Sequence, residues 1–251
     1  MAFYDLAKSD RDQLVKSVNS NILSDLRKKS HKHIFEYFSD EDTYIRKTAY
    51  LSIGRIYKAH SNLDTAIIAL LKKLFNSENA KVRQTVVNSA GEIGMVDFRI
   101  IELFMEKGLF DEHHSVRNAV IGSIKKMGEK NPKPVLAFAK RYLHHEDKEV
   151  RREICHGIEL RGRKHPQDIL PLLRELQDDK TTRVRSTLVH VIGQISYKKD
   201  CLETVIADLK KWKNKELAKD ALDEIIDVHH RYRNFSVKTQ KEAIKYISQH
   251  F

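Results

Sequence analysis

A short pattern recurs along this chain at a nearly constant spacing: an aliphatic residue, then arginine, then an apolar stretch. Its copies are Ile45-Arg46, Val82-Arg83, Val116-Arg117, Val150-Arg151 and Val184-Arg185. The arginines are separated by 37, 34, 34 and 34 residues, and a further step of 34 reaches Lys219, a degraded copy. Self-similarity at a fixed period of this length is the signature of a repeat architecture.

Each repeat predicts two helices joined by a polar turn. In the fifth repeat, two apolar stripes at helical spacing flank the turn 177–182. The stripes are Ile169, Leu170, Leu172, Leu173 and Leu176, then Val184, Leu188, Val191, Ile192 and Ile195. Asn131-Pro132 and His165-Pro166 stand where first helices should begin, which is where proline is best tolerated. A single pair cannot bury its apolar faces, so we expect about six stacked pairs.

The unit resembles the HEAT-like repeat over roughly residues 30–228. The resemblance rests on an Asp in the turn (Asp40, Asp111, Asp179) and on Val-Arg opening the second helix. It implies an all-α fold, a HEAT-like α-solenoid forming a right-handed, armadillo-like superhelix with second helices along the concave face. We expect one repeat domain over 1–251, with an N-terminal cap (1–29), repeats (30–228) and a C-terminal cap helix (229–251).

The repeated arginines could form a ladder for phosphates, but the HEAT resemblance favours a structural role. In that family the turn Asp and the opening Arg typically bond across or within repeats. Asp40 with Arg46, Asp111 with Arg117 and Asp179 with Arg185 fit this role. An arginine fork that holds a carboxylate and turn carbonyls suits a seam between repeats. These arginines are therefore not counted as ligand contacts.

The excess positive charge predicts a polyanion partner. The 251 residues carry 46 Lys+Arg against 35 Asp+Glu, and the net charge is +3 over 1–125 and +8 over 126–251. Positions one, five, eight and nine after each repeat arginine should approach the concave surface. With nearby side chains they give the expected nucleic-acid contacts Lys47, Arg55, Asn88, Asn118, Lys125, Lys126, Arg152, His156, Arg161, Arg163 and His190. A basic groove binds polyanions through counterion release, although lysine-rich surfaces also serve solubility alone.

The segment from Glu149 through Val184-Arg185 also resembles, in its rhythm, the HEAT-like DNA alkylation repair glycosylases. That resemblance implies a concave cleft with an essential carboxylate, in some branches beside tryptophans, to stabilise positive charge in the sugar. Of the two acids expected on the concave side, Glu92 and Glu159, the better candidate for this carboxylate is Glu159. The alternative role of Glu159 is a salt bridge with Arg152 or Arg163. The single tryptophan, Trp212, lies in a lysine-rich segment, so we expect it to pack rather than to stack on a base.

Neither metal nor cofactor chemistry is expected. The pairs His113-His114, His144-His145 and His229-His230 are adjacent in sequence, so on a helix their side chains diverge. Cys155 occupies an apolar position of the repeat, and Cys201 has no nucleophile constellation. No glycine-rich phosphate loop is present.

The sequence therefore predicts a binding scaffold rather than an enzyme. The first hypothesis is a non-catalytic relative of the alkylation repair glycosylases that holds DNA, or another nucleic acid, in a basic groove. The alternatives are a protein–protein interaction scaffold and an active alkylpurine DNA glycosylase using Glu159. We expect a cytoplasmic monomer, because no apolar run reaches membrane-spanning length and the first residues lack signal-peptide character.

Overall fold

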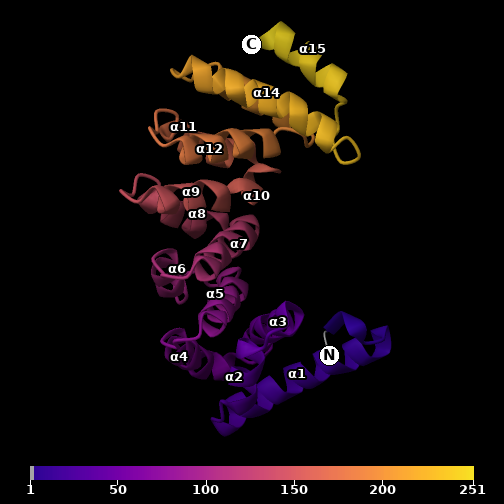
Figure 1. The fold of residues 1–251 in the computed structure, drawn as a ribbon, viewed down its shortest axis with the longest axis vertical. Helices are drawn as coiled ribbons and strands as arrows, with labels where there is room; N and C mark the ends of the chain where they lie inside the picture. Colours follow the sequence, from indigo (N-terminus) through magenta and orange to yellow (C-terminus); the bar gives the residue numbers. More distant parts are fainter. Residues whose placement is uncertain (1–2) are drawn as a thin grey trace. The chain divides into compact units, whose positions relative to one another are not determined.

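The computed structural model describes residues 3–251, and every regular element in that range is a helix. After a 3₁₀ turn (Phe3–Asp5) and α1 (Lys8–Lys28), the helices follow in pairs (Figure 1). The pairs are α2 (Lys32–Ser39) with α3 (Thr43–Ala59), α4 (Asp64–Phe75) with α5 (Ala80–Gly94), α6 (Glu102–Leu109) with α7 (His114–Lys130), α8 (Pro132–Tyr142) with α9 (Lys148–Gly157), α11 (Pro166–Glu175) with α12 (Thr182–Gln194), and α13 (Cys201–Leu209) with α14 (Lys215–Arg231). A short 3₁₀ helix (Ser61–Leu63) precedes α4, α10 (Glu159–Gly162) follows α9, and α15 (Gln240–His250) ends the series.

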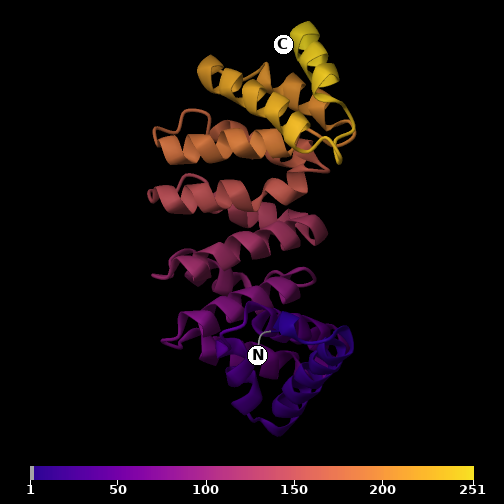
Figure 2. The same ribbon diagram turned by 45° about the vertical axis from the view of Figure 1, so that its right-hand side comes forward.

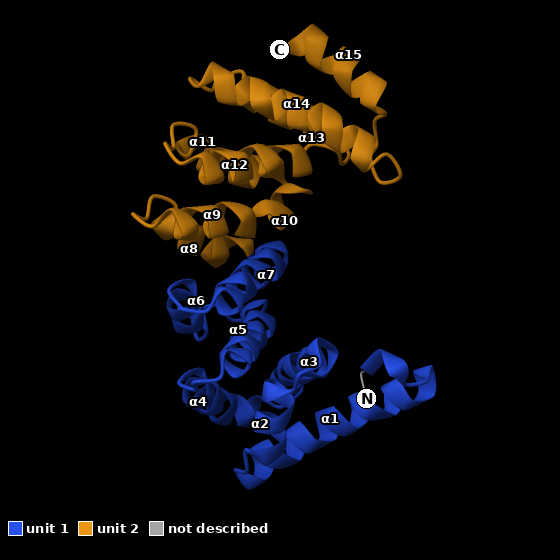
Figure 3. Cartoon of the chain, viewed as in Figure 1, with its two compact units in different colours: residues 1–131 blue, residues 132–251 orange. Residues whose placement is uncertain are grey.

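The chain divides into two compact units, residues 1–131 and residues 132–251 (Figure 3). In unit 1 the second helices pack in sequence, α3 on α5 and α5 on α7, and α1 packs against α3. In unit 2, α9 packs on α12 and α12 on α14, while α15 packs against α14 (Figure 2). The six expected pairs are thus present, whereas the single domain over 1–251 stays a prediction.

The start of each second helix is set four residues before the repeat arginine. Asp42, Asn79 and Asp147 stand at these positions, and each side chain accepts a hydrogen bond from a main-chain N–H of the first turn. Such caps satisfy donors that the helix itself leaves unpaired. Pro132 and Pro166 begin α8 and α11, as the sequence predicts.

The repeat pattern explains the core. The valine before each arginine is at most 1% exposed in the four later copies, whereas Ile45 in the first copy is half-buried. Eight residues after the arginine, glycine permits close helix contact. A Cβ added at Gly54 would lie 2.6 Å from Glu92 Cβ, and one at Gly91 would lie 2.4 Å from Ser123 Oγ. Second helices therefore approach to a distance that larger side chains would block.

Three side chains that could have carried chemistry are part of the core. Cys155 and Trp212 are at most 1% exposed, as expected for packing residues, and burial raises the pKa of the Cys155 thiol. Cys201 is also buried, and burial raises its thiol pKa as well. Among residues 3–251, no helix combines the length and the apolar character that crossing a membrane requires.

Candidate functional site

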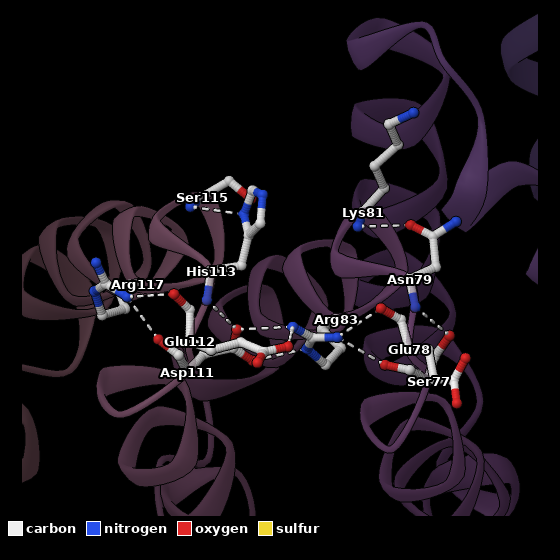
Figure 4. A network of polar contacts seen from close by, with 10 residues as sticks. All are labelled: Ser77, Glu78, Asn79, Lys81, Arg83, Asp111, Glu112, His113, Ser115 and Arg117. Carbon is white, nitrogen blue, oxygen red and sulfur yellow. Dashed lines mark hydrogen bonds and ion pairs between the residues drawn. The ribbon is translucent and has the colours of Figure 1, made fainter.

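The repeat arginines of α5 and α9 join neighbouring repeats. We call each arginine–aspartate pair, Arg83 with Asp111 and Arg151 with Asp179, a lock. Arg83 Nη1 donates to the carbonyls of Ser77 and Glu78, both at 2.9 Å, within its own turn. Its Nε and Nη2 donate to the two carboxylate oxygens of Asp111 in the next turn, at 2.8 and 3.0 Å (Figure 4). The guanidinium fork thus ties two successive turns, which is the bidentate geometry that arginine favours.

Unit 2 repeats this lock with the same spacing. Arg151 Nη1 donates to the carbonyls of His145 and Glu146, and its Nε and Nη2 reach Asp179 at 2.6 and 3.2 Å. The arginines are therefore structural, which confirms the expected role. They do not serve as a phosphate ladder in these two turns, because their donors already have partners.

The expected pairing of each turn Asp with its own repeat arginine is wrong in detail. Arg46 and Arg117 bind the main-chain carbonyls of Asp40 and Asp111, not the carboxylates. The Asp111 carboxylate also accepts the His113 N–H, so it serves its own turn and the arginine of the preceding repeat. The Asp111 carboxylate therefore binds the arginine of the preceding repeat, across the seam between the two repeats.

Arg185 breaks the pattern. Within residues 3–251 its guanidinium has neither a hydrogen bond nor an ion pair, so the expected bond to Asp179 is absent. The following turn carries Trp212 and Lys213 in the region where earlier turns carry aspartate. That turn is held instead by Gln177 Oε1, which accepts the main-chain N–H groups of Lys213 and Asn214.

The locks shift the pKa values of their members. Burial opposes ionisation of Asp111 and Asp179, but the guanidinium and main-chain hydrogen bonds outweigh it, so each carboxyl pKa is lowered. The same hydrogen bonds raise the pKa of Arg83 and Arg151. Folding therefore favours the ionised pairs.

In unit 2 the predicted phosphate contacts are paired with carboxylates. Arg152 Nε lies 2.9 Å from Glu149 Oε2, and its Nη2 lies 3.4 Å from Glu153 Oε1. Arg161 Nη2 lies 2.6 Å from Asp168 Oδ2. A phosphate could engage these guanidinium groups only by displacing or sharing their present partners.

Glu159, the carboxylate expected for glycosylase chemistry, lies inside this network. Its side chain is 2% exposed, and Oε1 accepts two hydrogen bonds from Arg163, at 2.9 Å from Nε and 2.5 Å from Nη2. Its other oxygen lies 3.1 Å from His156 Nε2. His190 Nδ1 lies 3.5 Å from Glu224 Oε1. The salt bridge with Arg163 is the structural alternative that the sequence left open.

In unit 1 the predicted contacts are less fully neutralised. The Lys47 side chain is exposed and makes no hydrogen bond or ion pair within residues 3–251. Arg55 is exposed and donates to Ser52 Oγ at 2.7 Å and to Asn19 at 3.5 Å, with no carboxylate partner in the described chain. Lys126 is the exception, because its Nζ lies 2.8 Å from Glu92 and 5.0 Å from the centre of the Tyr50 ring.

The remaining predicted residues of unit 1, Asn88, Asn118 and Lys125, lie on α5 and α7. Asn88 donates to the Gln84 carbonyl within α5, at 3.1 Å. Asn118 is exposed and Lys125 is half-buried on α7. All three stand on the second helices of their pairs.

A cleft of about 340 Å³ between α1 and α3 adds residues that the sequence interpretation missed. It is lined by Val15, Lys16, Asn19, Ser20, Arg55, Ile56, Ala59 and His60, and none of these is acidic. Lys16 lies on the helix interpreted only as a cap, and His60 lies beyond the positions counted for α3. The basic Lys16 followed by Asn19 and Ser20 on one helix face was the available signal.

A larger cleft, of about 610 Å³, lies between α12 and α14. Its polar lining mixes Arg185, His190 and Arg231 with Asp220, Glu224 and Asp227. Arg231 is paired with both Glu224 and Asp227 at 2.5 Å. This cleft therefore presents both signs of charge.

Comparison with known protein families also indicates helical repeats. A family model for HEAT repeats matches residues 135–226. These residues span α8 to α14, so this part of the chain consists of HEAT repeats. Over residues 135–226, this match confirms the repeats that the arginine spacing predicts. No curated protein sequence matches the chain.

Solved structures that are similar to this chain have low sequence identity to it. Kap95p, from a structure with RanGDP, is 15% identical with a TM-score of 0.51, and the match covers 88% of this chain and 32% of Kap95p. AlkD2 from Streptococcus mutans is 18% identical with a TM-score of 0.48, covering 82% and 97% of the two chains. The protein smu.31 from Streptococcus mutans UA159 is 19% identical with a TM-score of 0.47, covering 83% and 96%. The all-helical structure and the similarity to Kap95p confirm the predicted all-α, HEAT-like solenoid class.

Proposed function

We propose that this HEAT-like protein is a non-catalytic scaffold that binds the phosphates of a nucleic acid, with DNA the first candidate, through α1 and α3. The observation that carries the proposal is the cleft between these helices. Lys16, Arg55 and His60 line it, and none of its lining residues is acidic. Lys47 continues the basic surface along α3, two helical turns before Arg55.

The cations differ in whether they already have a carboxylate partner before a phosphate binds. A cation without a carboxylate partner releases only its counterions when it meets a phosphate, and that release drives binding. A guanidinium already held by a carboxylate must exchange one anion for another. We therefore assign the main contacts to Lys16, Lys47 and Arg55, and a secondary role to Arg152, Arg161 and Arg163.

The buried state of Glu159 supports the absence of glycosylase chemistry. A carboxylate that stabilises a cationic sugar must face the substrate. Here one oxygen is bound twice by Arg163 and the other faces His156, and the side chain is 2% exposed. This arrangement favours a structural carboxylate, so we expect no release of alkylated bases from methylated DNA.

The test is fluorescence anisotropy with labelled duplex DNA, single-stranded DNA and RNA over a range of salt. We expect Lys47→Glu with Arg55→Glu to weaken binding at least about ten-fold, because two phosphate contacts become repulsive. The matched control is Lys210→Glu with Lys211→Glu, two exposed lysines at the end of α13. It changes the net charge by the same amount, and we expect less than about a two-fold effect.

Two results would refute the proposal. One is that the unmodified protein binds none of the three nucleic acids at low salt. The other is an equal loss in both double variants, because affinity would then follow net charge and not the α1–α3 surface. Circular dichroism of each variant separates loss of binding from loss of folding.

A second candidate function, protein binding, is favoured by the cleft between α12 and α14. Its carboxylates Asp220, Glu224 and Asp227 would repel a polyanion but suit a partner with basic side chains. An affinity capture in which Asp220→Lys with Asp227→Lys removes a bound protein, while the α3 variant retains it, would favour this function over the first. Retention of the same protein by both variants would argue against it.

A further inference from the structure

The repeat places two histidines side by side in unit 2. His156 of α9 and His190 of α12 each stand five residues after the repeat arginine of their helix. Because α9 and α12 pack together, equivalent positions become neighbours. The two rings meet edge to face, with centres 6.0 Å apart and an interplanar angle of 78°.

Glu159 completes a three-residue cluster. One ligand atom from each of His156, Glu159 and His190 lies within 4.8 Å of the others. The carboxylate is buried, whereas the histidine side chains are 32% and 42% exposed. Two imidazole nitrogens and one carboxylate oxygen form a donor set that first-row divalent metals bind, with open positions left for water.

The distances require only a modest contraction. Ligand atoms of a tetrahedral zinc site lie about 3.3 Å apart, given zinc–nitrogen and zinc–oxygen distances of about 2.0–2.2 Å. The half-exposed histidine rings can turn to close the remaining gap, while the buried carboxylate stays in place. Without metal, the contact from His156 Nε2 to Glu159 Oε2, at 3.1 Å, occupies the position where the ion would lie.

Outer contacts already orient two of the three ligands. His190 Nδ1 faces Glu224 Oε1 at 3.5 Å, which leaves the other ring nitrogen for a metal. Glu159 Oε1 is held by Arg163, which leaves Oε2 toward the histidines. In such sites a metal-binding histidine usually donates its second ring N–H to a carboxylate. A metal-binding carboxylate is usually held by a further hydrogen bond.

We propose that His156, Glu159 and His190 bind a first-row divalent metal ion, with Zn²⁺ the first candidate. The ion joins α9 and α10 to α12 through one ligand from each helix. Water completes the coordination on the exposed side. Binding the ion stabilises the folded form of unit 2, since the three ligands lie on three helices and are brought together only by folding.

The test is calorimetric titration of the full chain with Zn²⁺, together with the melting temperature with and without Zn²⁺. We expect one site in the unmodified protein and a rise in melting temperature. His190→Ala should weaken that site at least about ten-fold and abolish the rise. The matched control is His230→Ala, which removes an exposed histidine of α14 outside the cluster and should leave both readouts unchanged.

Glu159→Gln tests the buried ligand, and His156→Ala keeps the test valid if Glu159→Gln does not fold. Replacement of Zn²⁺ by Co²⁺ gives a second readout, because the visible spectrum of Co²⁺ reports nitrogen and oxygen ligands in a four-coordinate site. Unchanged Zn²⁺ affinity in both His156→Ala and His190→Ala would overturn the proposal. So would an equal loss in His230→Ala, which would indicate dispersed surface histidines. The test is independent of nucleic-acid binding, because Zn²⁺ affinity and melting temperature are measured without nucleic acid.

Discussion

The two units share one structural device and differ in how they treat the cations beside it. Arg83 with Asp111 in unit 1 and Arg151 with Asp179 in unit 2 form the same lock between turns. On α3 of unit 1, Lys47 and Arg55 face solvent without carboxylate partners in the described chain. On α9 and α10 of unit 2, the arginines are paired with acidic side chains.

Because of this difference, the net charge of a unit does not tell how many of its cations lack a carboxylate partner. Unit 2 has the larger formal excess, +7 over residues 132–251 against +4 over residues 1–131. Its groove arginines are nevertheless neutralised locally, and many of its lysines lie on turns and helix ends, as Lys210, Lys211 and Lys213 do. A polyanion responds to local potential and to the ease of exchanging partners, so a count of charges by segment does not by itself locate a binding surface.

The shared locks give the largest expected effect. Asp111→Ala or Asp179→Ala should lower the free energy of unfolding by about 2–3 kcal/mol, because each leaves a largely buried guanidinium without its carboxylate. Urea unfolding followed by circular dichroism measures the loss. Glu78→Ala and Asp178→Ala, which remove exposed acids whose carboxylates do not contact the lock arginines, are the controls and should cost less than about 0.5 kcal/mol. A small loss in only one unit would break the equivalence of the two locks.

The locks also predict how stability depends on pH. The folded carboxyl pKa of Asp111 and Asp179 is lowered below the unfolded value of about 3.9. Their stabilisation is therefore present above about pH 4 and is lost as the pH falls through the folded pKa. The difference in unfolding free energy between the unmodified protein and Asp179→Asn should be constant near neutrality and shrink below about pH 4. A difference that grows on acidification would contradict the sign.

The contrast between α3 and α9 predicts a difference in salt dependence. Lys47→Ala with Arg55→Ala should reduce the slope of log affinity for DNA against log salt by about two, one for each phosphate that the variant no longer neutralises. Arg152→Ala should change it by less than one, because that guanidinium is already paired with Glu149. Equal slopes for both variants would remove the distinction between the units.

The smallest expected effect concerns the arginine that has no lock. Arg185→Ala should change the free energy of unfolding by less than about 0.5 kcal/mol, as at other surface sites. Arg151→Ala, its equivalent one repeat earlier, should cost about 2 kcal/mol because it removes the hydrogen bonds to Asp179 and to the turn carbonyls. If both cost the same, the sequence repeat and not the observed pairing would decide the energetics.

Much of the architecture follows from the sequence because it depends on local periodicity. The buried valines, the caps at Asp42, Asn79 and Asp147, and the prolines at Pro132 and Pro166 are set within one or two helical turns. Gly54, Gly91 and Gly193, which permit close helix contacts, share a spacing of eight residues after the arginine. Those features require only the helical period and the need to bury an apolar face.

The candidate sites could not be predicted in the same way. The proposed metal cluster joins His156 to His190 across 34 residues, whereas sequence inspection considered adjacent histidines, whose side chains diverge. The α1–α3 cleft depends on how a cap helix lies against the first repeat. The exchange of aspartate partners between repeats depends on which turn lies beside which arginine.

The sequence by itself determined the repeat, the helix pairs and the residues that fill the core, since these are properties of short segments with a strong hydrophobic period. Only the tertiary structure decided which charges remain available. An arginine carries the same charge in every copy, but whether a carboxylate lies within hydrogen-bonding distance depends on the neighbouring helix. The free energy of exchanging water, counterion or carboxylate for a ligand is set by that neighbour.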